Sequence, residues 1–317
     1  MEIICINVGY GDSIFLQSEG YRLLVDGGSA DPNEYRGDRT PALAWLQKCG
    51  VGALDAVVVS HIHEDHVGGL EAVLGQLAVK ELWLPCPAEF FYSGRAFCVP
   101  DDTAENIRLF TQALNAMERL VRLAEARGTR LREVSRGAVI ALGGGLKAKA
   151  LGPDAKRRTA FADLLARVYQ CEADGDALPF LAALDSQSND ASLMLKFTGP
   201  GLSMLLPGDC CPHAWPEGLT ESDLRADVFK LPHHGQIDSV TADAIRAVRP
   251  RVVLTTSSSD RRYNSSNPGV YRLISSVLPA DAQPDFLFSD EADYPPYTYG
   301  RRRAQAVRLN LPGGGHK

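Results

Sequence analysis

Short apolar runs alternate with longer amphipathic runs along most of this chain. Residues 3–8 and 13–17 are rich in apolar side chains and flank a Gly-Tyr-Gly-Asp turn, which predicts a β-hairpin. Residues 56–60 are apolar up to a final serine, as in a strand that is buried on both faces. Residues 103–127 place apolar side chains on one face at helical spacing and predict the clearest helix. The alternation of strand and helix predicts an α/β protein.

The helix predicted at 103–127 begins after Asp102 or Thr103, because either side chain suits an N-cap. Further strands are predicted at 21–25, 80–85, 131–134, 138–142, 146–151, 192–197, 202–209, 227–232, 251–256 and 305–311, and further helices at 40–48, 70–77, 219–226, 240–247 and 268–277. The polar stretch 154–188 predicts an inserted helix and loop. Because no repeat or linker interrupts this pattern, we expect residues 1–317 to form one domain of packed, mixed sheets.

An excess of acidic residues limits the partners that the chain can have. Lys and Arg number 33 and Asp and Glu number 39, which gives a formal net charge of −6. This balance excludes a generally basic nucleic-acid-binding protein, although a local basic patch or bound metal ions could still serve an anionic substrate. A composition of 45% hydrophobic and 23% charged residues excludes a disordered chain.

The cysteines and the N-terminus bear on the compartment. Seven cysteines without a CxxC spacing indicate reduced thiols rather than a disulfide framework. The first residues lack the basic and apolar regions of a signal peptide. Because no run approaches the roughly 18 apolar residues of a membrane span, we expect a cytoplasmic protein without membrane insertion.

The densest chemical feature is the segment His61-Ile62-His63-Glu64-Asp65-His66, which holds three of the seven histidines. Imidazole nitrogens and carboxylate oxygens bind zinc and harder transition metals. The segment follows the apolar strand at 56–60, and Gly68-Gly69 would let the next helix pass close to it. An ordinary polar loop would need neither the buried strand nor the glycines, so we predict a metal site.

Two later strands also end in side chains that can bind metals. Residues 202–206 run into Pro207-Gly208-Asp209, and one carboxylate there can bridge two metals through its two oxygens. An ordinary Gly-Asp turn explains that segment equally well when it is taken alone. The strand that ends at Lys230 runs into Pro232-His233-His234-Gly235. Three strands with such ends predict one rim at which they converge.

Together these motifs resemble the metallo-β-lactamase superfamily, and within it the metallo-hydrolase domain of competence (ComEC-like) proteins. The segments NVGYGDSIFL, LLVDGG, HIHEDHVGG, SNDASLMLKF, LLPGDC and KLPHHG follow one another in the order of that branch, over about residues 3–277. The resemblance implies an αββα sandwich of two mixed sheets flanked by helices, with a metal site at one edge. The membrane channel of competence proteins has no counterpart in this sequence.

The resemblance also implies a ligand set for two divalent ions, expected to be zinc with manganese as the alternative. The implied ligands are His61 and His63 for the first ion, Asp65, His66 and His234 for the second, and Asp209 as the bridge. Asp26 would orient the histidines, as outer partners of metal ligands do. Asp65, Asp209 and His233 are the implied catalytic residues, with His233 as a substrate contact or proton donor. Asp12 is expected to hold a turn rather than a metal.

One ligand of the superfamily pattern has no counterpart. No histidine lies between His66 and His213, where most members supply another histidine to the first ion. Asn189, Asp190 or a water could take that place, and oxygen-richer ligation would shift the preference toward manganese. Phosphate contacts are expected from Arg261 and Arg262 and from the run at 301–303, although a solvated arginine face is the simpler explanation.

The expected function is a metal-dependent hydrolase, in particular a two-metal phosphodiesterase or nuclease that acts on nucleic acid or a nucleotide through a metal-bridging hydroxide. The acidic composition keeps a small non-nucleotide substrate open, such as a phosphocholine-type ester or a lactone. A metal-stabilised binding module without turnover is the third possibility. The family resemblance alone does not choose among them, because one metal centre serves many reactions.

Overall fold

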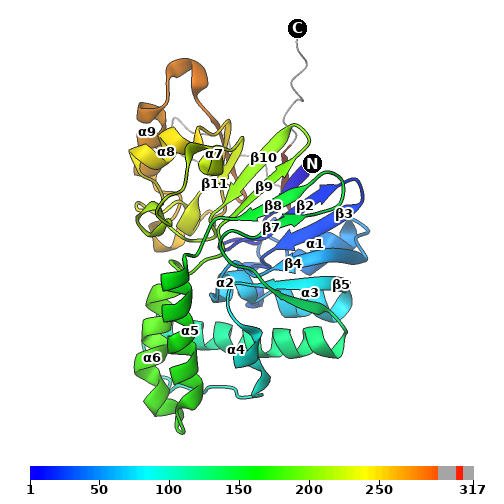
Figure 1. Ribbon diagram of the computed structural model, residues 1–317, viewed down its shortest axis with the longest axis vertical. Coiled ribbons are helices and arrows are strands. Elements are labelled where there is room, and N and C mark those ends of the chain that lie inside the picture. The colour runs from blue at the N-terminus through cyan, green and yellow to red at the C-terminus, as the bar shows by residue number, and fades with distance from the viewer. Residues whose placement is uncertain (292–304, 310–317) are drawn as a thin grey trace.

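Two mixed sheets face each other in the computed structural model, which describes residues 1–291 and 305–309 (Figure 1). The first sheet has the order β14 (Ala306–Leu309), β1 (Glu2–Ile6), β2 (Ile14–Ser18), β3 (Tyr21–Val25), β4 (Ala53–Val58), β5 (Ala78–Leu84) and β6 (Arg130–Glu133). The second has the order β13 (Asp285–Phe288), β12 (Val252–Thr255), β11 (Val228–Lys230), β10 (Leu202–Leu206), β9 (Leu195–Gly199), β8 (Lys147–Ala150) and β7 (Val139–Ala141).

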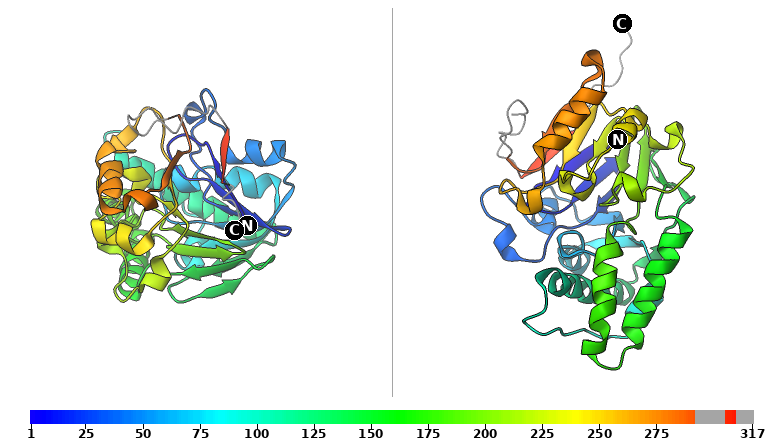
Figure 2. Two further views of the ribbon diagram at one scale, coloured as in Figure 1. Left: turned by 90° about the horizontal axis from the view of Figure 1, so that it is seen from above. Right: turned by 90° about the vertical axis from the view of Figure 1, so that its left-hand side faces the viewer.

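Helices cover the outer face of each sheet. The described helices are α1 (Ala42–Lys48), α2 (Glu64–Val67), α3 (Leu70–Gln76), α4 (Glu105–Ala126), α5 (Ala155–Gln170), α6 (Asp174–Ser188), α7 (Glu221–Leu224), α8 (Ala242–Val248) and α9 (Pro268–Val277). Helices α1, α3 and α4 contribute to the core on the first sheet, whereas α8 and α9 pack on the second. Figure 2 shows α8 and α9 together on one side of the molecule.

Alternation of side chains along each strand builds these layers. In β1, Ile3 and Cys5 face the second sheet, whereas Ile4 and Ile6 join the core beneath α1, α3 and α4. In the same way, Met204 of β10 lies between the sheets and its neighbour Leu205 packs toward α8 and α9. Because successive side chains on a strand point to opposite faces, each apolar strand serves two layers. The result is the expected αββα sandwich of two mixed sheets flanked by helices.

Most of the expected elements are present, and two details differ. The strands β1 and β2 form the expected antiparallel hairpin. Helix α4 begins at Glu105 with Ala104 as N-cap and no side-chain bond there, so the predicted cap at Asp102 or Thr103 is wrong. The stretch 154–188 forms the two helices α5 and α6 rather than one helix and a loop.

The helical hairpin of α5 and α6 packs into the hydrophobic core that lies between the first sheet and α1, α3 and α4. Phe161 and Leu165 of α5 and Leu181 and Leu184 of α6 are buried in the same cluster as α4. In Figure 1 this helical pair stands below the sheets, beside one end of α4. The chain leaves the second sheet at β8 and returns in the antiparallel neighbour β9, so the pair is an excursion between adjacent strands.

Every helix within residues 1–291 and 305–309 is too short or too polar to cross a bilayer.

A close approach of two backbone segments brings the start of α3 against the end of β3. Gly69 N donates to Gly28 O over 2.8 Å, and Gly27 N donates to His66 O over 2.8 Å. A Cβ atom at Gly69 would overlap the carbonyl oxygen of Gly27. The expected role of Gly68-Gly69, to let the helix pass close to the site, is therefore visible in the backbone.

We predict that Gly69→Ala destabilises the protein, because the methyl group would force these two segments apart. The free energy of unfolding should fall by about 1–3 kcal/mol, as for other overpacked sites. Urea unfolding followed by circular dichroism measures this change. Gly52→Ala is the matched control, since a Cβ atom there meets no atom within 4 Å. Equal losses in the two variants would contradict the prediction.

Candidate metal centre

The segments singled out in the sequence meet where strands of both sheets end. The segment 61–66 follows β4, and Asp26 follows the neighbouring parallel strand β3. Asp209 follows β10, and His234 lies in a short 3-10 turn, η4 (Pro232–Gly235), after the parallel strand β11. Because the carboxyl ends of parallel strands share one edge of a sheet, the two pairs of strands deliver their side chains to a common place.

Four donor atoms surround one point in this place. His234 Nε2 lies 3.0 Å from both Asp65 Oδ2 and Asp209 Oδ2. His66 Nε2 lies 3.5 Å from the same two oxygens. Ligand atoms about 2.0–2.2 Å from a tetrahedral zinc ion are roughly 3.4 Å from one another. The spacing of these four donors therefore fits a single ion.

Hydrogen bonds on the far side of each ring turn the other nitrogen toward this point. His66 Nδ1 lies 2.9 Å from Asp26 Oδ2, and His234 Nδ1 donates to Thr256 O over 2.8 Å. The Nε2 atoms of both rings are buried and have no hydrogen-bond partner among the described residues. Each Nε2 atom faces the Asp65 and Asp209 carboxylates, and a metal ion at the shared point would satisfy the nitrogens and the carboxylate oxygens together.

A second pair of donors lies next to the first group. His61 Nε2 and His63 Nδ1 are 3.0 Å apart, and Ser60 Oγ lies 3.0 Å from the other nitrogen of His61. Donor atoms of His61, His66 and Asp209 all lie within 4.8 Å of one another. Asp209 is thus placed between the two groups, as a bridging carboxylate requires.

The structure separates the two candidates for the missing ligand of the first group. Asn189 Oδ1 is buried, has no hydrogen-bond partner in the part of the chain that the structure describes, and lines the same cavity as His63. Asp190 instead pairs with His213, whose Nε2 lies 3.2 Å from Asp190 Oδ1. Asn189 thus lines the cavity that His63 also lines, whereas Asp190 is not among its lining residues.

Lys230 makes an unexpected contact with the candidate bridge. Its fully buried ammonium lies 2.9 Å from Asp209 Oδ1 and 2.6 Å from Asp12 Oδ2, and it donates to Gly208 O over 3.1 Å. Asp209 therefore presents only Oδ2 to the imidazoles. One oxygen of Asp209 thus faces the imidazoles and the other pairs with the lysine, and bridging through both oxygens stays a prediction.

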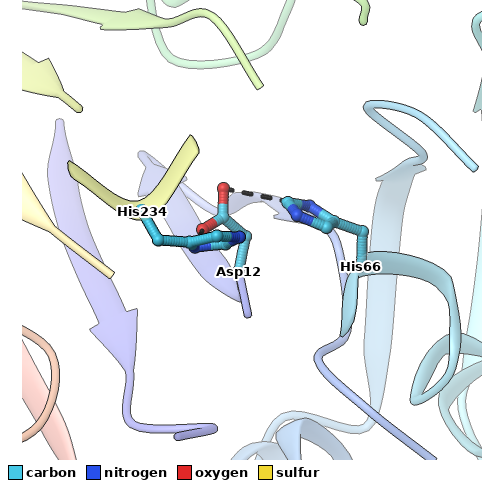
Figure 3. Close-up of side chains that lie close together, drawn as sticks. All are labelled: Asp12, His66 and His234. Carbon is cyan, nitrogen blue, oxygen red and sulfur yellow. Dashed lines mark ion pairs between the residues drawn. The ribbon is translucent and has the colours of Figure 1, made fainter. Parts of the chain in front are cut away.

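Asp12 belongs to this site as well as to its turn. Figure 3 shows its carboxylate between the rings of His66 and His234. Asp12 Oδ1 lies 3.6 Å from His234 Nδ1, and Asp12 Oδ2 lies 4.0 Å from His66 Nδ1. Both distances lead to the nitrogens that face away from the donor point, so Asp12 supports the ligand rings and does not join them.

Charge interactions among these buried groups favour ionised carboxylates. Burial alone would raise the pKa of Asp65, but the neighbouring His66 and His234 lower this pKa well below its usual range. Burial alone would lower the pKa of His234, but the Asp209 carboxylate raises it to about 9. For His61, burial and the adjacent His66 both lower the pKa, which keeps the ring neutral and its nitrogens able to bind metal.

Four of the donor residues, His63, Asp65, Asp209 and His234, line a cavity of about 990 Å³. Tyr10, Phe110 and Tyr263 line it, and His233 faces it beside His234. Arg262 also lines the cavity but pairs with Glu34, with 2.6 Å between Nη1 and Oε1. Arg261 is not among the lining residues, and the arginine run at 301–303 lies outside the described residues.

Three residues of the site were missed by the sequence analysis. Lys230 could have been noticed, because it stands in the same KLPHHG segment as the histidines. Asp185 of α6 lies 3.3 Å from His63 Nε2, and Asp238 lies 3.3 Å from His233 Nδ1. Neither aspartate stands in a motif of its own.

Residues 6–85 match the sequence model of the Metallo-beta-lactamase superfamily. The chain contains a metallo-beta-lactamase superfamily domain. The superfamily, like the His and Asp donors described above, indicates a metal-dependent hydrolase that uses divalent ions. All the expected metal ligands that precede α4 lie within this matched segment.

Relatives extend the similarity beyond the superfamily segment. The chain is 25% identical over 286 residues to ComE operon protein 3 of Bacillus subtilis (strain 168), which covers 86% of the chain and 30% of that protein. It is 37% identical over 73 residues to anti-Pycsar protein Apyc1 of Saccharibacillus brassicae, which covers 22% of the chain and 26% of that protein. The matches thus span less than a third of either relative's length.

Among solved structures, an isothiocyanate hydrolase from Delia radicum gut bacteria is similar over 99% of this chain and 100% of its own. The sequence identity is 14% and the TM-score is 0.48.

We predict that Lys230→Met destabilises the metal-free protein. The substitution leaves the buried carboxylates of Asp12 and Asp209 without their shared cation, so the free energy of unfolding should fall by about 3–5 kcal/mol. Urea unfolding in the presence of a chelator measures this loss.

The control is another lysine–aspartate pair, Lys80 with Asp55, whose Nζ and Oδ1 atoms are 2.6 Å apart while the Lys80 side chain is 75% exposed. Lys80→Met should change the free energy of unfolding by less than about 1 kcal/mol, because exposed pairs contribute little. If the two variants lose the same stability, the burial of Lys230 has no special role.

Proposed function

We propose that the chain is a metal-dependent phosphodiesterase that acts on a nucleotide or nucleic acid. The observation that supports this most strongly is the donor set Asp65, His66, Asp209 and His234 around one point, with the His61 and His63 pair beside it. His63, Asp65, Asp209 and His234 of this set line a cavity of about 990 Å³, which is large enough for a nucleotide-sized ligand.

Nitrogen and oxygen donors in this combination fit zinc, with manganese as the alternative. His61, His63 and Asn189 would hold the first ion, and Asp65, His66 and His234 the second, with Asp209 shared. When bound, two divalent ions would polarise a phosphoryl oxygen and lower the pKa of an attacking water, which is the chemistry that diester hydrolysis needs.

The chain's own residues fix these donors in advance. Asp26 and the carbonyl of Thr256 set which nitrogen of His66 and His234 faces the cavity. Lys230 holds one oxygen of Asp209 and leaves the other toward the imidazoles. Such outer contacts hold ligands in orientation and support the metal affinity of a site.

His233 is suited to handle a proton at the leaving group. Its ring lines the cavity, and its Nδ1 lies 3.3 Å from both carboxylate oxygens of Asp238. A carboxylate on Nδ1 orients an imidazole and stabilises its protonated form. We therefore assign His233 as the proton donor and Asp238 as its positioning residue.

The charge of the cavity favours a second candidate substrate. The described residues that line the cavity include one arginine, Arg262, and seven acidic residues. These are Asp31, Glu34, Glu64, Asp65, Glu105, Asp185 and Asp209. Tyr10, Phe110 and Tyr263 add aromatic faces of the kind that bind quaternary ammonium groups. A small ester with a cationic end, such as a phosphocholine-type ester, suits this lining better than a long polyanion does.

The test loads the metal-free chain separately with zinc or manganese and counts bound metal by mass spectrometry. Hydrolysis is then measured on a chromogenic phosphodiester, a phosphocholine ester, dinucleotides, and single- and double-stranded DNA and RNA. We expect diester cleavage, and we expect Asp209→Ala to lower it at least about a hundredfold, the loss that even outer partners of a metal can cause.

Asp190→Ala is the matched control, because Asp190 pairs with His213 away from the donors. It should keep the activity of the unsubstituted chain. Tight metal binding without cleavage of any diester would refute the proposal. Cleavage confined to the phosphocholine ester would establish the second candidate instead.

A further inference from the structure

We propose that Cys211, His233 and Asp238 form an accessory site for an ion of the zinc class at the side of the cavity. The Cys211 Sγ and His233 Nδ1 atoms are 4.0 Å apart, and His233 Nδ1 lies 3.3 Å from each oxygen of Asp238. One donor atom from each of the three residues lies within 4.8 Å of the others.

These distances suit a shared ion better than they suit hydrogen bonds. An N–H···O bond is usually about 2.9–3.0 Å long, so 3.3 Å is near its upper limit. Around a tetrahedral zinc ion, with a bond of about 2.3 Å to sulfur and about 2.0 Å to nitrogen, ligand atoms are separated by roughly 3.3–3.6 Å. A small adjustment of the partly exposed Asp238 and His233 side chains closes the set.

The backbone turns His233 toward this cluster and away from His234. Both residues adopt left-handed backbone conformations, with φ of 50° at His233 and 51° at His234. Such conformations are unfavourable for residues other than glycine, and two in succession need a compensating role. Here they direct His234 to Asp65 and Asp209 while His233 meets Cys211 and Asp238.

The cluster is chemically distinct from the dinuclear donor set. It contains a thiol, whereas that set consists of imidazole, carboxylate and amide groups. Thiolate with imidazole and carboxylate prefers zinc, cobalt or cadmium over manganese, and binding would release the thiol proton. The neighbouring Cys210 does not share the position, because its Sγ faces the carbonyl oxygens of Asp190 and Cys211.

An ion at this site would occupy the Nδ1 atom of His233 that Asp238 otherwise holds. The ion would displace the contact through which Asp238 positions His233, so excess zinc would lower the hydrolysis rate where manganese would not. This consequence rests on the proposed function, whereas the binding site itself does not.

The test uses the full chain loaded with cobalt(II), zinc or manganese. We expect a thiolate-to-cobalt charge-transfer band in the near ultraviolet, together with one more zinc than manganese bound per chain. Cys211→Ser should abolish the band and the additional zinc, and Asp238→Asn should lower the additional zinc. Cys210→Ser, the matched control, should keep both.

A folded, cobalt-loaded chain without a thiolate band would overturn the proposal. So would a band that survives Cys211→Ser, whichever other cysteine supplies it. Circular dichroism checks that each variant folds, and Asp238→Asn tests the site independently if Cys211→Ser does not fold. Because the readouts are a spectrum and a metal count, a chain that binds the thiolate-linked ion but cleaves no diester would refute only the proposed function.

Discussion

A single buried ammonium group joins the two sheets at the place where the ligands collect. Lys230 ends β11 of the second sheet, Asp12 lies in the connection between β1 and β2 of the first sheet, and Asp209 follows β10. Each of these charges would be costly in the interior by itself, so the three stabilise the fold only when they are together. Their contact therefore fixes how the loops of one sheet approach those of the other.

The ligand geometry follows from this contact. With one oxygen of Asp209 committed to Lys230, the other lies between the imidazoles of His66 and His234. Asp26 and Thr256 then choose the ring nitrogens that face inward. One lysine offsets part of the cost of this buried, anionic cluster, and the remaining carboxylate oxygens face the Nε2 atoms of His66 and His234.

The layers could be predicted from the sequence because their signal is local. The burial of the apolar run at 56–60 and of the N-terminal hairpin can be predicted from a few consecutive apolar residues in each. The segment 154–188 was harder, because α6 carries Pro179 and no clear amphipathic pattern, and its packing partners α4 and α5 are not visible in a window of sequence. The N-cap of α4 was predicted wrongly for a related reason. The actual cap, Ala104, makes no side-chain hydrogen bond, so its residue type does not mark the start of a helix.

The site residues, too, could be predicted from the sequence only where their signal is local. The three histidines of 61–66 lie within six residues and could be identified from the sequence. Asp185 lies beside His63 only because α6 packs against α4. Asn106 of α4 holds the second oxygen of Asp185 at 2.7 Å, and Ser188 at the end of α6 donates to Ile62 O over 3.0 Å. Two of these contacts, from Asp185 and from Ser188, join the helical pair to the histidine segment, and the third ties the pair to α4.

The helical pair α5 and α6, inserted between β8 and β9, thus forms one structural unit. It enters and leaves through adjacent strands of one sheet, yet it carries Asp185 and Asn189 into the cavity. An exchange of this helical pair between related chains would alter the residue beside His63 and the wall of the cavity in a single step. The surroundings of His63 and the wall of the cavity therefore change together, because the same few turns of helix supply both.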